Sequence, residues 1–152
     1  ATGSGNKAMM SAEYFLTIVD RENGDLLTNL KIQKLLYYSQ GFTLAIYRYP
    51  LFEEKIIAWN LGPVVLEVYE QYKSFGADPI PPPKDFDAEK YSPDSKDLLN
   101  EVFEVYGQFS AAALVNMTHE EAPWKTTKTH SEIDLKKLQN FFSTRLRHDG
   151  EN

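Results

Sequence analysis

Apolar residues recur at helical spacing over most of the chain, which predicts a mainly helical protein. The longest periodic segment begins after Thr28, a residue type that caps helices, and runs to about Tyr47. Its apolar positions are Ile32, Leu35, Leu36, Phe42 and Ile46. These residues make a large part of the helix circumference apolar, which predicts that this helix is the central one. Gly41 interrupts it at a cost of about 1 kcal/mol relative to alanine, which indicates that another helix approaches closely at that point.

Further helices are predicted on both sides of this segment. We expect them over 11–19, from Gly62-Pro63 to Gly76, from Ser92-Pro93 to about Phe109, from Ser110 to about Thr118, and from Ser131 or Asp134 onward. Their inward stripes include Leu98, Leu99, Val102, Val105, Leu135, Leu138, Phe142 and Leu146. Residues 51–61 lack this period, and the β-branched run at Ile56 predicts a short strand or extended segment.

These patterns predict a mainly α, compact bundle of about five to seven helices. They place a short extended or β segment near 51–61 and a proline-rich loop near 78–91. The length of 152 residues fits one domain, which we assign to 10–148. We expect 1–9 to be a flexible lead or cloning remnant and 149–152 to be a polar tail.

Composition and charge narrow the functional classes. The chain has no cysteine, which excludes disulfides and thiolate metal sites and favours a reducing compartment such as the cytoplasm. No apolar stretch is long enough to cross a membrane. A net charge of −6 disfavours nucleic-acid binding and suits a partner with a basic surface. Lys31 and Lys34 share a helix face that we expect to be solvated.

The sequence contains no recognisable catalytic, metal or phosphate motif, so we expect no cofactor and no metal. We expect the acidic pair Glu120-Glu121 to be solvated. His119 lies just before Pro123-Trp124. Either it contacts a ligand or partner, or it donates to a backbone carbonyl and packs on Trp124. We favour the packing interpretation, because tryptophan beside proline often closes a core.

A family resemblance adds a specific function. The residues that carry it are Thr28 to Tyr38, Ala58-Trp59 with Gly62-Pro63-Val64, Val68-Tyr69, and Thr118-His119 with Pro123-Trp124. Taken in this order, they resemble the Panacea domain, also called the SocA-like or phage-associated GepA-like domain of unknown function. The resemblance extends from about Met10 to the final helix. Two positions depart from it: the family often has an aromatic residue or histidine at Leu61 and proline at Leu66.

The resemblance implies an antitoxin-like protein that is not an enzyme and neutralises a co-encoded toxin by direct protein–protein binding. Some relatives resemble adaptors that deliver a toxin to an ATP-dependent protease, which is the alternative hypothesis. A small-molecule enzyme using His119 and nearby acids is a third. The expected partner is the cognate toxin, with a protease and a second copy of the chain (a homodimer) left open. We expect neither membrane nor nucleic acid as a partner.

We expect the partner surface to combine the exposed side of the helix over 30–47, the segment 59–65 and the proline loop. The candidate motif residues are Lys34, Tyr37, Trp59, Gly62, Pro63, Tyr69, His119 and Trp124. Most of them should shape the core or a groove, and only some should touch the partner. No residue is assigned a catalytic role.

Overall fold

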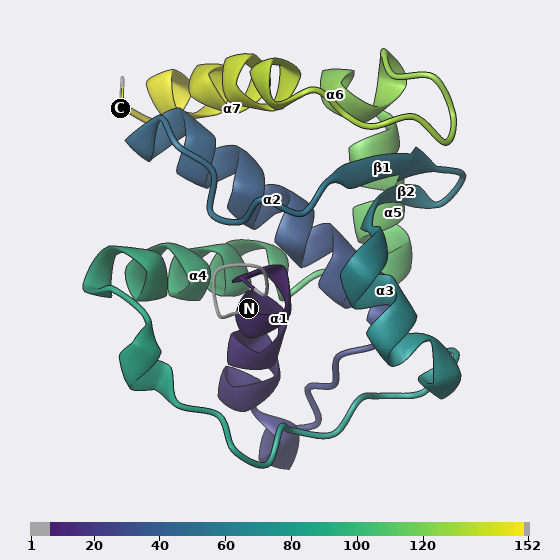
Figure 1. Cartoon of the computed structure of the whole chain (residues 1–152), viewed down its shortest axis with the longest axis vertical. Coiled ribbons are helices and arrows are strands. Elements are labelled where there is room, and N and C mark those ends of the chain that lie inside the picture. The colour runs from purple at the N-terminus through teal and green to yellow at the C-terminus, as the bar shows by residue number, and fades with distance from the viewer. Residues whose placement is uncertain (1–6, 151–152) are drawn as a thin grey trace.

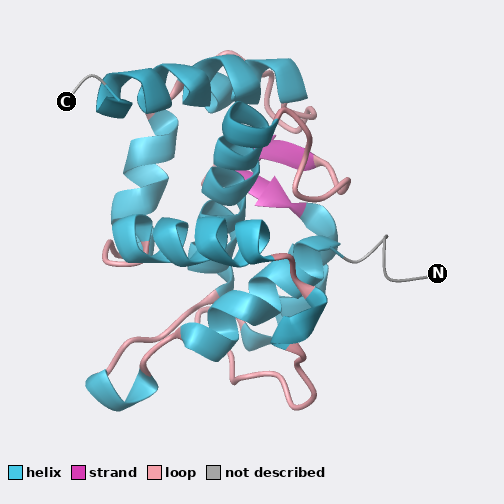
Figure 2. Ribbon diagram, turned by 90° about the vertical axis from the view of Figure 1, so that its left-hand side faces the viewer, coloured by secondary structure: helices cyan, strands magenta, loops and turns pink. Residues whose placement is uncertain are grey.

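The structure of the chain, a computed structural model, describes residues 7–150 (Figures 1 and 2). In chain order the helices and strands are α1 (Lys7–Ile18), α2 (Asn29–Tyr47), β1 (Ile56–Trp59), β2 (Gly62–Val65), α3 (Leu66–Tyr72), α4 (Pro93–Tyr106), α5 (Ala111–His119), α6 (Ala122–Lys125) and α7 (Leu135–Gly150). Three short 3₁₀ turns lie at Arg21–Asn23, Lys73–Phe75 and Ala88–Lys90. The described part is thus mainly helical with one small antiparallel sheet, which confirms the predicted class.

Helix α2 is the central element, as predicted. Every residue from 32 to 41 is buried, and α7, α4, α5 and β2 all pack around the helix (Figure 1). Thr28 caps its start by accepting a hydrogen bond from the Lys31 backbone N–H. At Gly41 an added Cβ would lie 2.2 Å from the ring of Phe142 on α7. The glycine therefore permits the close approach of α7 that the sequence indicated.

The prediction that Gly62-Pro63 starts a helix is wrong, because these residues begin strand β2 and α3 starts only at Leu66. Strand β2 pairs antiparallel with β1, with Trp59 opposite Gly62 and Ala58 opposite Pro63. Gly62 has φ +106, a value that side chains rarely tolerate, and it follows the tight turn between the strands. Glycine and proline mark turns as readily as helix starts, so local sequence could not separate the two.

Proline is tolerated inside β2 because its missing N–H is not needed for strand pairing. The N–H of Ala58, opposite Pro63, donates to Ser131 O at 2.9 Å, and the carbonyl of Ala58 accepts from the His130 N–H. Both groups of Ala58 therefore face away from β2. Ile133 N–H also donates to Ile56 O at 2.8 Å, so the segment 130–133 covers the free side of β1.

Most other predicted boundaries are confirmed within a few residues. Ser92 and Ser110 cap α4 and α5 by accepting hydrogen bonds from the backbone N–H of Ser95 and Ala113. Two limits differ: α1 begins at Lys7, inside the expected lead, and α7 continues to Gly150, inside the expected tail. The structure does not describe the rest of the expected lead (1–6) or the rest of the expected tail (151–152).

The proline-rich segment 78–91 is a loop with one 3₁₀ turn, as predicted. It crosses the lower end of the molecule in Figure 1 and is attached there by Ile80, which is buried and donates from its N–H to Leu27 O at 2.9 Å. In the described part of the chain, no helix is long and apolar enough to cross a membrane.

Three residues that the helical stripes place inward remain partly exposed. Ile46, Val105 and Leu135 are 46%, 44% and 42% exposed. A helical period shows which face of a helix is apolar. How much of that face is buried depends on the neighbouring helices. The expected inward positions of these three residues are therefore corrected.

Candidate functional site

The candidate motif residues gather around the β1–β2 hairpin. Beside it lies a cavity of about 510 Å³, here called the hairpin pocket. Its lining residues are Asn29, Leu30, Gln33, Trp59, Asn60, Leu61, Val64, Tyr69, Lys73, Gly76, Ala77 and His130. Two of the three segments expected to form the partner surface, helix α2 and the hairpin, therefore meet at this pocket. No described residue of the third segment, the proline loop, lines it.

The exposed part of this face combines Leu61 with the polar residues Asn60, Lys73 and His130, beside two half-buried aromatic rings. Leu61, at the hairpin turn, is 56% exposed, and Trp59 and Tyr69 are half-buried. The two rings pack edge to face, with centroids 5.1 Å apart. Such aromatic side chains beside an exposed leucine are typical anchors of protein–protein contacts.

The α5–α6 corner holds the hairpin turn in place. The Trp124 indole N–H donates to Trp59 O at 2.7 Å, and the His119 ring Nε2 lies 2.9 Å from Asn60 O. A carbonyl can only accept, so Nε2 of His119 carries the hydrogen. The His119 ring also stacks on Trp124 at a centroid distance of 4.1 Å. The packing interpretation of His119 is therefore confirmed, with the ring half-buried.

Beneath the hairpin, polar side chains of α2 bind its backbone. Gln33 Oε1 accepts from the Val65 N–H at 2.9 Å, and Lys34 Nζ donates to Pro63 O at 3.1 Å. A Cβ at Gly62 would lie 2.8 Å from Lys34 Cε, so the hairpin approaches this lysine too closely for a side chain. The expected solvated position of Lys34 is wrong, because the hairpin folds over this part of α2 and buries the side chain completely.

Burial without a carboxylate partner makes Lys34 an unusual lysine. Desolvation lowers the pKa of Lys34 from its ordinary value of 10.5 to about 7. Between these two pH values the unfolded chain binds a proton at this position that the folded chain largely lacks. The contribution of Lys34 to stability therefore increases as the pH rises from 7 toward 10.5.

We predict that Lys34→Met removes this pH dependence. From pH 7 to pH 9 the free energy of unfolding of the parent chain should rise by about 2 kcal/mol relative to the variant. Urea denaturation at several pH values measures the difference, with the exposed Lys84→Met as the control, which should follow the parent curve. Parallel curves for the parent and Lys34→Met would contradict the assignment.

A buried carboxylate, which the sequence analysis missed, lies next to this region. Glu121 is 3% exposed and accepts hydrogen bonds from the hydroxyls of Tyr37 and Tyr38, both at 2.9 Å. The Arg145 guanidinium lies 3.7 Å from the same carboxylate. Burial raises the pKa of Glu121, while the two tyrosines and Arg145 act in the opposite direction. The expected solvation of Glu121 is wrong, although its neighbour Glu120 is exposed.

One sequence signal could have located Glu121. Tyr37 and Tyr38 are adjacent on the central helix, and buried tyrosine hydroxyls need hydrogen-bond partners. A polar acceptor was therefore required somewhere near the middle of α2. The sequence does not show which of its many acids meets these hydroxyls, because Glu121 is more than eighty positions away.

The candidate residues thus fall into two groups by exposure. Lys34, Gly62 and Pro63 are buried in the hairpin and its support, and Tyr37 is buried against Glu121 and Phe142. Trp59, Tyr69, His119 and Trp124 are half-buried around the hairpin. Over the described residues, no three acids or histidines come together in a way that could hold a metal ion.

Comparison with known families decides the family of this chain. The family described as "Antitoxin SocA-like, Panacea domain" matches residues 32–125, which is more than half of the 152-residue sequence. The chain belongs to this SocA-like antitoxin family. The matched range includes the hairpin together with its supports on α2, α5 and α6. No protein of curated function and no solved structure matches the chain.

Membership confirms the resemblance found in the sequence over residues 32–125. It indicates an antitoxin-type role, a non-enzymatic one, and a toxin as the general kind of partner. The Panacea domain here contains every candidate motif residue from Lys34 to Trp124.

Proposed function

We propose that this Panacea-domain protein is a cytoplasmic antitoxin that neutralises a co-encoded toxin by binding it directly at the hairpin pocket. The observation that carries the proposal is the hairpin turn, where the exposed Leu61 lies beside the half-buried Trp59 and Tyr69, fixed in place within the range that matches the antitoxin family. The toxin would be inhibited because this rigid face covers a surface that the toxin needs for its activity.

The rigidity of the hairpin supports binding of this kind. Its backbone is held from two sides, by Trp124 and His119 at the turn and by Gln33 and Lys34 beneath β2. A face that is ordered before binding loses little conformational entropy when a partner docks, which leaves more of the contact energy for affinity. The half-buried rings of the pocket and the exposed Leu61 would supply the central apolar contacts.

Position 61 also offers a reason for partner choice. The family often has an aromatic residue or histidine there, whereas this chain has an exposed leucine at the rim of the pocket. Leu66, the second departure, is 39% exposed at the start of α3. We infer that these two positions help to select the toxin, because exposed side chains can change specificity without disturbing the fold.

Leu61→Glu should abolish neutralisation while leaving the fold intact. The substitution places a charge at the centre of the proposed apolar contact, and we expect binding at least about tenfold weaker. The measurements are growth on co-expression with the adjacent gene and co-purification of its product. The matched control is Leu26→Glu, since Leu26 is similarly exposed at 51% but does not line the pocket. Two results would exclude the hairpin pocket as the contact. One is equal growth with the parent and with Leu61→Glu, and the other is an equal loss of growth with Leu61→Glu and with Leu26→Glu.

The same co-expression separates occlusion from delivery to a protease. Under occlusion, growth is rescued equally in cells with and without the ATP-dependent protease. Under delivery, rescue and toxin decay both require the protease. Absence of any rescue or co-purification with the parent protein would reject the antitoxin proposal itself.

A further inference from the structure

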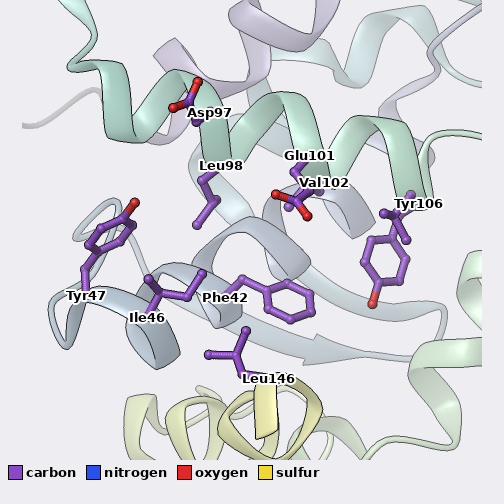
Figure 3. Close-up of a pocket in the computed structure, with 10 residues that line it drawn as sticks. Phe42, Ile46, Tyr47, Asp97, Leu98, Glu101, Val102, Tyr106 and Leu146 are labelled. Atoms are coloured by element: carbon purple, nitrogen blue, oxygen red, sulfur yellow. The ribbon is translucent and has the colours of Figure 1, made fainter. Parts of the chain in front are cut away.

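A second apolar surface lies away from the hairpin, between α2, α4 and α7 (Figure 3). This space, here called the α2–α4 groove, has a volume of about 220 Å³. It is lined by Phe42, Ile46, Tyr47, Asp97, Leu98, Glu101, Val102, Val105, Tyr106 and Leu146. None of these residues lines the hairpin pocket.

The groove exists because the apolar stripes of α2 and α4 extend beyond the part of each helix that the core covers. Leu98 and Val102 are buried at its floor, whereas Ile46 and Val105 at its sides are 46% and 44% exposed. Figure 3 shows Ile46 and Phe42 on α2 facing Leu98 and Val102 on α4 across the open space. The volume exceeds that of a cavity of about 150 Å³ that holds a benzene molecule, so a large apolar side chain can enter.

The charges at the groove have a single sign. Among the described residues that line it, Asp97 and Glu101, one turn apart on α4, are the only charged ones, and both are exposed. Lysine and arginine do not occur among the described residues that line it. An apolar floor beside two carboxylates is complementary to a segment that carries both apolar and basic side chains. The net charge of −6 would further attract such a segment.

The shape of the groove favours a helix as the occupant. Its walls are helices, whose backbone groups are already paired within each helix, so an added strand would find no hydrogen-bond partners there. From Asp97 to Tyr106 the wall on α4 is about 14 Å long, which corresponds to about two and a half turns of a helix. A docked helix of this length presents apolar residues at positions i, i+3 or i+4, and i+7.

We propose that the α2–α4 groove is a docking site for an amphipathic helix of a partner protein, with apolar residues along one stripe and lysine or arginine on either side. The apolar stripe fills the space between Ile46 and Val105, and the basic residues pair with Asp97 and Glu101. This site is separate from the hairpin pocket and does not depend on the toxin being bound there.

The test uses a synthetic peptide of about 18 residues with leucines at helical spacing and lysines flanking them. The ¹⁵N-labelled 17.4 kDa chain is titrated with this peptide and followed by NMR. We expect chemical-shift changes concentrated on the second half of α2 and on α4, with an affinity that falls as salt rises. Two control peptides, one with glutamates in place of the lysines and one with the leucine spacing scrambled, should bind at least about tenfold more weakly.

Charge-reversed variants locate the site. Asp97→Lys combined with Glu101→Lys should weaken binding of the lysine peptide about tenfold and remove its salt dependence. The matched control combines Glu67→Lys with Glu104→Lys, which has the same net charge but changes exposed acids outside the groove. This control should bind within about twofold of the parent.

Three results would overturn the proposal. The first is equal binding of the lysine and glutamate peptides. The second is a set of shift changes at the hairpin pocket in place of α2 and α4. The third is a dimer of the free protein in sedimentation that Asp97→Lys with Glu101→Lys dissociates, because the groove would then be occupied by a second copy. None of these results bears on neutralisation of a toxin, which the co-expression experiment measures separately.

Discussion

Replacing Glu121 by alanine is expected to lower the free energy of unfolding by about 4 kcal/mol. The substitution leaves the hydroxyls of Tyr37 and Tyr38 without their acceptor inside the protein, and each unpaired hydroxyl costs about 1–3 kcal/mol. It also opens a space at the junction of α2, α6 and α7 and removes the partner of Arg145. Urea denaturation at neutral pH measures the loss.

Two comparisons make this result specific. Glu120→Ala changes the exposed neighbouring acid and should alter stability by less than about 0.5 kcal/mol. Adding Tyr37→Phe and Tyr38→Phe to the Glu121→Ala variant should recover part of the loss, because the unpaired hydroxyls are then removed. If Glu121→Ala were no less stable than Glu120→Ala, the buried cluster would not contribute to stability as described.

Gly41→Ala should destabilise the protein by about 3 kcal/mol, although alanine is the better helix former by about 1 kcal/mol. The new Cβ would lie 2.2 Å from the Phe142 ring, so α7 or the ring must move. The ring has little freedom, since it is fully buried and packs edge to face on Tyr37 and Phe42 with centroids 5.5 and 4.8 Å away. Thermal and urea unfolding both measure this change.

A compensating substitution tests the cause. Phe142→Leu alone should cost about 1–3 kcal/mol, because it leaves space beside α2. In the Gly41→Ala background the smaller side chain makes room for the new methyl group, so the double variant should be more stable than the sum of the two losses predicts. Additive losses, within about 0.5 kcal/mol, would show that the clash with Phe142 is not the reason for glycine at position 41.

The helices could be predicted from sequence because their causes are local. The period of apolar residues and the caps at Thr28, Ser92 and Ser110 depend on nearby residues or on one face of one helix. Strand β1 lies within the extended or β segment predicted near 51–61, but its pairing with β2 could not be predicted in the same way. Strand β1 is fixed partly by the segment 130–133, which is about seventy positions away along the chain.

The candidate site was predicted least well where charged residues are buried. The residue types of Lys34 and Glu121 favour solvent. Only the tertiary fold supplies the Pro63 carbonyl that accepts from Lys34 and the two tyrosine hydroxyls that donate to Glu121. The packing of His119 was predictable because Trp124 lies only five residues further along, directly after a proline. Side-chain burial of a charged group is thus a property of contacts that sequence spacing does not reveal.

The small sheet has a final consequence for the behaviour of the protein in a crowded cell. On the outer side of β2, Pro63 has no N–H, its carbonyl is bound by Lys34, and the N–H of Val65 is bound by Gln33. On the outer side of β1, the segment 130–133 occupies the backbone of Ile56 and Ala58. These groups are therefore not available to pair with strands of other molecules. The protein can expose Leu61 at its hairpin turn without promoting aggregation through this sheet.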